Sequence, residues 1–98
     1  MITKALGEFA GSLRYGDLPD QVVHTVKLRI IDTLASAMAA VRLGRDRIID
    51  ELYVTPGEAA VWGSDRKRSV RDATVLNSFR SHASYLDDGD RFSGAHPG

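Results

Sequence analysis

The feature that most constrains the fold is a long run of residues with helical periodicity, residues 20–41. Apolar side chains recur there every three or four positions, which places one stripe along a helix: Val23, Val26, Ile30, Leu34, Ala37 and Val41. Towards its C-terminal end, ASAMAA, this helix is small and apolar nearly all round. Such a surface requires close packing by other helices, and a chain of 98 residues supplies few of them. The run therefore predicts an all-α chain that lacks some of its packing partners.

Shorter elements flank this helix. Residues 3–13 carry apolar side chains on one helical stripe, and the sequence RYGDLPD after them predicts a turn. Asp17 is expected to cap the long helix, with Pro19 in its first turn. Gly44 is expected to end it, and RDRIIDELY predicts a short third helix.

The helical pattern breaks after residue 53. Pro56-Gly57 predicts a turn, EAAVW a short extended stretch, and the cluster DRKR at residues 65–68 a solvated turn. Ser69, with an aspartate three residues on, predicts the start of a further helix. The expected buried side of that helix consists of Val75, Leu76, Phe79, Ala83 and Leu86. The sequence thus predicts about four helices with one short irregular or extended excursion.

Composition excludes several classes of function. Thirteen basic and thirteen acidic residues cancel, so no global field attracts nucleic acid or an anionic membrane. The absence of cysteine excludes disulfides, thiol nucleophiles and cysteine-ligated metals. The start of the chain is no signal peptide, and no apolar run approaches the roughly 20 residues that span a bilayer. We therefore expect a soluble, cytoplasmic protein that binds neither nucleic acid nor membranes.

The chain closes on a segment rich in chemically active side chains, YLDDGDRFSGAHPG. Asp87 and Asp90 follow a helix C-terminus, where the helix dipole disfavours carboxylates, and His96 suits proton transfer near neutral pH. Residue chemistry leaves three interpretations open: a small site that joins these three groups, a solvated turn with a polar tail, or a divalent-cation site. The spacing matches neither an EF-hand loop nor a common zinc pattern. Sequence physics alone favours the solvated turn.

Four segments, in their order, resemble the N-terminal part of the MmgE/PrpD family, which includes 2-methylcitrate dehydratase and cis-aconitate decarboxylase. The segments are DLP..VV...K..IIDTLASAMA, A.VWG, A.VLNS...HA and LDDGDRF...HPG, and together they cover essentially the whole chain. The resemblance implies a large all-α domain joined to a smaller α+β lid domain, usually as a homodimer, of which residues 1–98 form a part of the helical domain. It also implies lyase or isomerase chemistry on small di- or tricarboxylates, with neither a metal nor another cofactor.

The resemblance also implies site residues. In that family the loop after the NS...HA helix typically reads Asp-aromatic-Asp/Asn-Asp-Thr and reaches a His-Pro motif, and its acidic residues and histidine line the active site. Asp87 matches the first aspartate, Asp90 the last, and His96 the histidine of the His-Pro motif. These three residues are the expected catalytic groups.

This chain departs from the family pattern at three positions of the loop. Asp88 stands at the aromatic position, Gly89 at the Asp/Asn position and Arg91 at the threonine. The departures put the methylcitrate and cis-aconitate specificities in doubt, and Arg91 can instead pair with a substrate carboxylate. His82 by itself is typical of a hydrogen-bonded structural histidine. Within the lyase interpretation, His82 and Arg91 are the expected substrate-binding residues.

We therefore expect the N-terminal segment of a metal-free, dehydratase-like carbon–oxygen lyase. The expected reaction removes a proton next to a carboxylate, with loss of hydroxyl or CO2. The resemblance places the family's other active-site residues beyond Gly98, so the 98 residues are expected to be inactive alone. The alternative is a non-enzymatic helical module for binding or dimerisation.

Overall fold

The computed structural model of the chain describes residues 1–86, 89 and 92–94. The α-helices in this part are α1 (Ile2–Ser12), α2 (Asp20–Arg42), α3 (Arg47–Leu52) and α4 (Val70–Ala83). A 3-10 turn, η1 (Tyr15–Asp17), joins α1 to α2, and two short strands, β1 (Ala59–Ala60) and β2 (Lys67–Arg68), lie between α3 and α4. The predicted all-α class, with four helices and one extended excursion, is confirmed.

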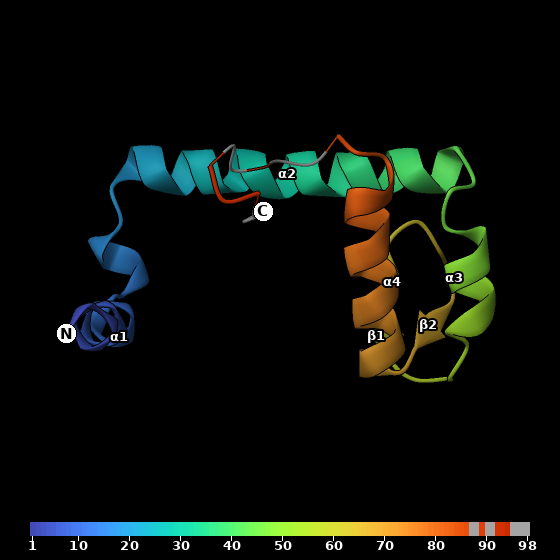
Figure 1. Cartoon of the computed structure of the whole chain (residues 1–98), viewed down its shortest axis with the longest axis horizontal. Coiled ribbons are helices and arrows are strands. Elements are labelled where there is room, and N and C mark those ends of the chain that lie inside the picture. Colours follow the sequence, from blue (N-terminus) through green and yellow to red (C-terminus); the bar gives the residue numbers. More distant parts are fainter. Residues whose placement is uncertain (87–88, 90–91, 95–98) are drawn as a thin grey trace.

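The chain has a packed half and an open half (Figure 1). In the packed half, residues 33–83, α4 packs against the last turns of α2 and runs across α2 rather than along it. The helix α3 and the two strands pack against α4. The open half, residues 1–32, contains α1, η1 and the first turns of α2. Of the elements that the structure describes, none packs against α1.

The ends of α2 follow local rules, with one correction. Gly44 adopts a left-handed φ of +64° and donates its N–H to the Val41 carbonyl at 3.0 Å, so α2 ends as predicted. Pro19 stands at the N-cap position, directly before the first turn. Asp17 does not cap α2: its Oδ2 accepts the N–H of Arg14 at 2.8 Å and closes η1. The prediction for Asp17 is wrong because the preceding turn uses this carboxylate.

Small residues bring α4 close to α2. Ala37 and Ala40 have no exposed surface, as the ASAMAA sequence predicts, whereas Val26 and Ile30 of the same stripe are 49% and 55% exposed. Among the described residues, the long helix therefore lacks partners along its first turns, whereas the sequence indicated missing partners from its small, apolar C-terminal end. Neither α2 nor another helix in the described part of the chain is long and apolar enough to cross a membrane.

Leu76 of α4 is the centre of the core and is fully buried. The residues around it are Val61 and Ala73, with Ile49, Tyr53 and Ala59 at the edge. The predicted buried side of α4 is wrong for Phe79, which is 37% exposed, and for Leu86, which is 65% exposed. The prediction fails for Leu86 because α4 ends at Ala83 and Leu86 lies beyond it. Phe79 lies within α4 but lines an open groove on that helix.

The excursion between α3 and α4 contains the predicted extended stretch. β1 pairs with β2 in antiparallel register, Ala59 opposite Arg68. Gly57 permits this packing, because a Cβ there would lie 2.5 Å from the carbonyl oxygen of Arg68. The prediction of a solvated turn at residues 65–68 is wrong for Arg68, which is buried and donates from Nε to the Tyr53 carbonyl at 3.1 Å.

Candidate functional site

The sequence predicts five site residues, and the structure places one of them. His82 lies in the last turn of α4, whereas Asp87, Asp90, Arg91 and His96 lie outside the described residues. What the structure provides is therefore the helix that leads into the predicted catalytic segment, and the contacts that hold this helix in place.

Two polar side chains on α4 fasten the excursion to the helix. Asp72 accepts the backbone N–H of Thr55 through Oδ2 at 2.9 Å. Asn77 accepts the backbone N–H of Trp62 through Oδ1 at 2.9 Å and donates from Nδ2 to the carbonyl of Ala60 at 3.1 Å. The oxygen and the nitrogen of the Asn77 amide both bind backbone groups of the excursion. They replace the hydrogen bonds that a neighbouring β-strand would make with these groups.

A buried arginine completes this attachment. Arg80 is 3% exposed and binds two carboxylates, Asp46 through Nε at 2.7 Å and Asp50 through Nη2 at 3.1 Å. Its Nη1 also donates to the carbonyl of Trp62. A buried charge is tolerated only when it is paired and hydrogen-bonded, so Arg80 fixes the position of α3 and the excursion on α4. We refer to Asp72, Asn77 and Arg80 as the polar clamp.

The Asp72 carboxylate is held in its charged form. The backbone N–H of Thr55 is the main cause that keeps the pKa of Asp72 below its ordinary value of 3.8, and the Thr55 side chain, Arg71 and Ser69 add to it. Burial acts in the opposite direction without overcoming these bonds. The N–H of Asp72 also donates to Ser69 Oγ at 3.2 Å, which confirms the predicted helix start.

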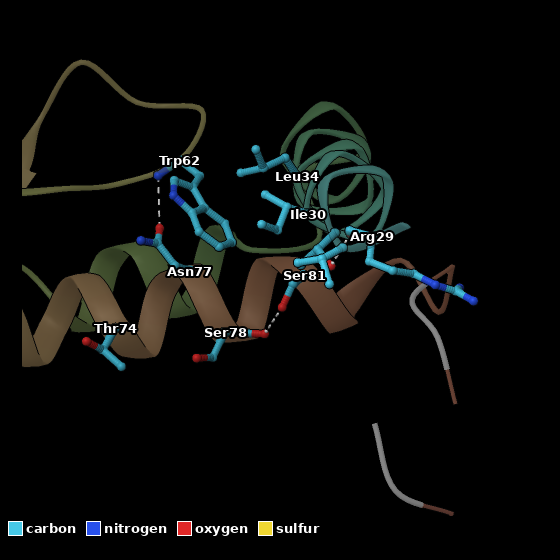
Figure 2. A pocket seen from close by; sticks show the side chains of 10 residues that line it. Arg29, Ile30, Leu34, Trp62, Thr74, Asn77, Ser78 and Ser81 are labelled. Atoms are coloured by element: carbon cyan, nitrogen blue, oxygen red, sulfur yellow. Dashed lines mark hydrogen bonds between the residues drawn. The ribbon is translucent and has the colours of Figure 1, made fainter. Parts of the chain in front are cut away.

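Trp62 stands over a groove of about 920 Å³ between α2 and α4 (Figure 2). Its indole faces Ile30 and Leu34 of α2, while the α4 wall presents hydroxyl groups such as that of Ser81, which donates to the Ser78 carbonyl at 2.8 Å. In the part of the chain that the structure describes, its lining contains one charged side chain, Arg29, and no carboxylate or histidine. This groove therefore offers apolar contact but no acid–base pair.

A second groove, of about 670 Å³, contains the predicted site residue His82, and we call it the His82 groove. Its main lining residues are Arg45, Val75, Phe79, His82, Ala83 and Tyr85. The rings of His82 and Tyr85 lie with their centroids 5.2 Å apart and their planes tilted by 59°. The groove thus combines two nitrogen-bearing side chains with an apolar wall, directly before the predicted catalytic segment in the sequence.

Tyr85 turns the chain out of α4. Its φ of +56° lies in the left-handed region, and its N–H donates to the carbonyl of His82 at 2.9 Å. Helices commonly end in this conformation with glycine, whereas a side chain with a Cβ costs about 1–2 kcal/mol there. Sequence reasoning missed this turn, since a glycine or asparagine is the usual signal for it.

A divalent-cation site is an alternative to the predicted metal-free site. Among the described residues, no group of three His, Asp or Glu side chains lies close enough together to hold an ion. The cation-site interpretation depends on Asp87, Asp90 and His96, which lie outside the described residues.

Residues 4–98 match the MmgE/PrpD N-terminal domain, a range that runs from α1 to the end of the chain. No curated protein and no solved structure matches it. The family match therefore includes the polar clamp, the His82 groove and the segment that contains the predicted catalytic residues.

Proposed function

The chain belongs to the MmgE/PrpD family, and from this premise we propose that it is the N-terminal segment of a lyase or isomerase that acts on small di- or tricarboxylates. The observation that carries the proposal is the family match, which extends through Asp87, Asp90 and His96. In the proposed dehydratase-like reaction, one group removes the proton next to a carboxylate and another protonates the departing hydroxyl. The products are an unsaturated carboxylate and water.

The side chains of the terminal segment suit these two tasks. Histidine exchanges protons near neutral pH, and an aspartate whose pKa is matched to the reaction acts as a general acid or base. In this proposal Asp87, Asp90 and His96 are the acid–base groups. Arg91 and His82 hold the carboxylates of the substrate, because charge-assisted hydrogen bonds to an anion are stronger than neutral ones.

The architecture supports the proposal by providing a rigid support for that segment. The polar clamp joins α4 to α3 and to the excursion through hydrogen bonds and ion pairs of 2.7–3.1 Å. General acid–base catalysis requires groups held within hydrogen-bond reach of the substrate. A catalytic segment that follows α4 therefore begins from a fixed end. In the active protein we further propose a homodimer, as the family resemblance implies.

The test uses the native gene product that carries this segment. It is incubated with citrate, 2-methylcitrate and cis-aconitate, and absorbance of the conjugated double bond and release of CO2 are followed. Wild-type turnover is expected on at least one of the three. Asp90→Asn and His96→Gln should each lower kcat by about 10²- to 10⁴-fold without changing the unfolding midpoint. Asp65→Asn, at an exposed position, is the matched control and should retain wild-type activity. Fully active Asp90 and His96 variants would contradict the proposal, as would a folded wild type without turnover on these three acids and on a wider panel of small di- and tricarboxylates.

A non-enzymatic helical binding or dimerisation module is the second candidate, favoured by the apolar surface that the open half exposes. The intact mass of the native gene product separates the two. A mass several times the 10.7 kDa of these 98 residues supports the lyase. A mass equal to 10.7 kDa leaves too few catalytic groups and supports the module.

A further inference from the structure

We infer that Arg45 is a further substrate-binding residue, which together with His82 binds one carboxylate group of the substrate in the His82 groove. The inference rests on the proposed function and deepens it. It adds a residue outside the terminal segment and assigns a ligand chemistry, a carboxylate with a short carbon chain, to a groove that the structure describes.

The groove joins two cationic or proton-bearing side chains that are far apart in the sequence. Arg45 lies in the turn between α2 and α3, and His82 lies in the last turn of α4, yet both line the same groove. Among the described residues the Arg45 guanidinium makes no hydrogen bond or ion pair, in contrast to Arg80, which binds two carboxylates and a carbonyl. Its donors remain available for an anion.

The backbone under Arg45 is firmly held. The N–H of Arg45 donates to the carbonyl of Ala40 at 3.0 Å, and Gly44 before it takes the left-handed conformation that ends α2. Asp46 after it is bound by the buried Arg80 at 2.7 Å. The base of the Arg45 side chain is therefore fixed between a helix end and a buried ion pair, which lowers the entropic cost of holding a ligand.

The lining of the groove selects an anion with apolar parts. Val75, Phe79 and Tyr85 form its apolar wall, and no aspartate or glutamate is among its lining residues in the described part of the chain. The apolar wall can contact the carbon chain of such a ligand, while a guanidinium binds a carboxylate through charge-assisted hydrogen bonds. The volume of about 670 Å³ lies within the range of about 300–1,000 Å³ that is usual for small-molecule sites.

A third groove, lined by residues of both charges, shows why the absence of carboxylates from the described lining of the His82 groove is important. That groove, of about 400 Å³, also contains arginines, among them Arg47 and Arg66, but Asp46, Asp50 and Asp65 line it as well. Its carboxylates offset its cations and repel an anionic ligand. Among the residues that the structure describes, the lining of the His82 groove has one arginine and no carboxylate, so it is the better site for an anion.

The position of the groove connects it to the proposed chemistry. Tyr85 lies on its wall and packs on His82, and the predicted catalytic Asp87 follows Tyr85 by two residues in the sequence. A di- or tricarboxylate anchored here by one carboxylate is held at the end of α4, from which the chain continues into the predicted catalytic segment. Binding energy from this remote carboxylate then serves to orient the reacting end.

The test uses the native gene product with the variants Arg45→Gln and Arg45→Lys. The matched control is Arg42→Gln, because Arg42 is an exposed arginine in the last turn of α2 that is not among the lining residues of the groove. Kinetics are measured on the carboxylate that the wild type turns over. Binding is measured separately, as the rise in unfolding midpoint with tricarballylate, a tricarboxylate that has no hydroxyl to lose. Sulfate at equal ionic strength serves as the anion control.

We expect Arg45→Gln to raise KM at least tenfold with less than a threefold change in kcat, and to abolish the stabilisation by tricarballylate. Arg45→Lys should fall between this variant and the wild type, and Arg42→Gln should behave as the wild type. His82→Gln should weaken tricarballylate binding in the same direction. Because Arg45 is exposed, the variants should have wild-type unfolding midpoints without ligand.

Three results would overturn the inference: unchanged KM and stabilisation in Arg45→Gln, an equal loss in Arg42→Gln, or equal stabilisation of the wild type by sulfate. Failure of the proposed function gives a different pattern, because the wild type then turns over none of the carboxylates. Tricarballylate binding that Arg45→Gln abolishes would still support the carboxylate site in that case. No stabilisation of the wild type by tricarballylate would refute the site.

Discussion

The two ends of α2 carry similar apolar patterns in opposite surroundings. Near its C-terminus small residues such as Ala37 and Ala40 are completely buried under α4, while near its N-terminus Ile30 and Ile31 are more than half exposed. The stripe of α1, which includes Phe9, is exposed as well. An amphipathic pattern therefore specifies which face of a helix is to be buried, but a separate element has to supply the partner.

The open half also shows in the overall dimensions. The radius of gyration is 16.3 Å, whereas a compact domain of this length has about 12.6 Å. The accessible surface of 7712 Å² exceeds the roughly 5,500 Å² of a compact monomer of this mass by about 2,200 Å². Part of this excess is apolar surface on α1 and on the first turns of α2, and folded proteins normally cover contiguous apolar patches larger than about 300–600 Å². The packed half thus has its own hydrophobic core. The open half exposes apolar side chains that could form a core only with a further packing partner.

The largest expected effect would come from breaking the packed half at Arg80. Arg80→Met leaves the Asp46 side chain, 8% exposed, without its buried partner, and such a loss costs about 3–5 kcal/mol. Urea unfolding followed by circular dichroism should show a chain that is largely unfolded in water. Arg42→Met, at an exposed arginine, should change the free energy of unfolding by less than about 0.5 kcal/mol. Equal effects of the two changes would show that the clamp does not support the packed half.

A smaller effect should follow from a cavity in the core. Leu76→Ala removes most of the one large side chain that is fully buried in the described part of the chain, and such truncations cost about 2–5 kcal/mol. The matched change in the open half, Ile30→Ala, should cost less than about 0.5 kcal/mol in the 98-residue chain. The difference between the two free energies of unfolding measures the contrast directly. A loss for Ile30→Ala close to that for Leu76→Ala would remove the distinction between the halves.

Whether a feature of the fold could be predicted depends on how far apart in the sequence the interacting residues are. The end of α2 at Gly44 and the start of α4 at Ser69 follow from local rules that a short window of sequence displays. The burial of Arg80 does not, because its partners Asp46 and Asp50 lie 34 and 30 residues away. A single sequence gives no indication that these three charges meet.

The candidate site was predictable to a similar extent. The family resemblance led to the segment after α4, and the family match supports that identification, while the roles of Asp87, Asp90 and His96 stay predictions. Arg45 was missed because it belongs to a turn that joins two helices, and only the tertiary fold brings it to the groove of His82. Tyr85 was missed because tyrosine seldom takes a positive φ.

The next effect in size depends on pH and concerns the hydrogen bonds of Asp72. Since its pKa is lowered from 3.8 in the folded chain, the ionised carboxylate contributes stability that is complete above the unfolded value. This contribution is lost as the pH falls from about 3.8 through the lower folded value. Asp72→Asn should therefore be less stable than the wild type at pH 7, by less than Leu76→Ala, and the difference should disappear in acid.

Urea midpoints measured from pH 7 down to pH 2 would test this, with Asp65→Asn at an exposed carboxylate as the control. A constant difference between wild type and Asp72→Asn over the whole range would contradict it.

The smallest effect on stability is expected in the open half. Phe9→Lys replaces an exposed aromatic side chain of α1, so the unfolding midpoint should change by no more than about 2–4 °C, which corresponds to about 0.5 kcal/mol for a chain of this length. Self-association of the 98-residue chain should nevertheless decrease, because the substitution interrupts the apolar surface. Size-exclusion chromatography with light scattering measures this directly. A large drop in the midpoint would instead show that α1 is packed.

The polar clamp lies on α4, and the Tyr85 turn follows two residues after the last residue of that helix. This arrangement has a consequence for insertions and deletions. Each residue of an α-helix advances the chain by 1.5 Å and rotates it by about 100°. One residue added between Arg80 and Ala83 would leave the clamp intact but would rotate the exit of the chain to another face of α4. Substitutions in this stretch leave the exit of the chain in place. An insertion or a deletion moves it. The count of residues from the clamp to the turn is therefore itself a determinant of where the following segment begins.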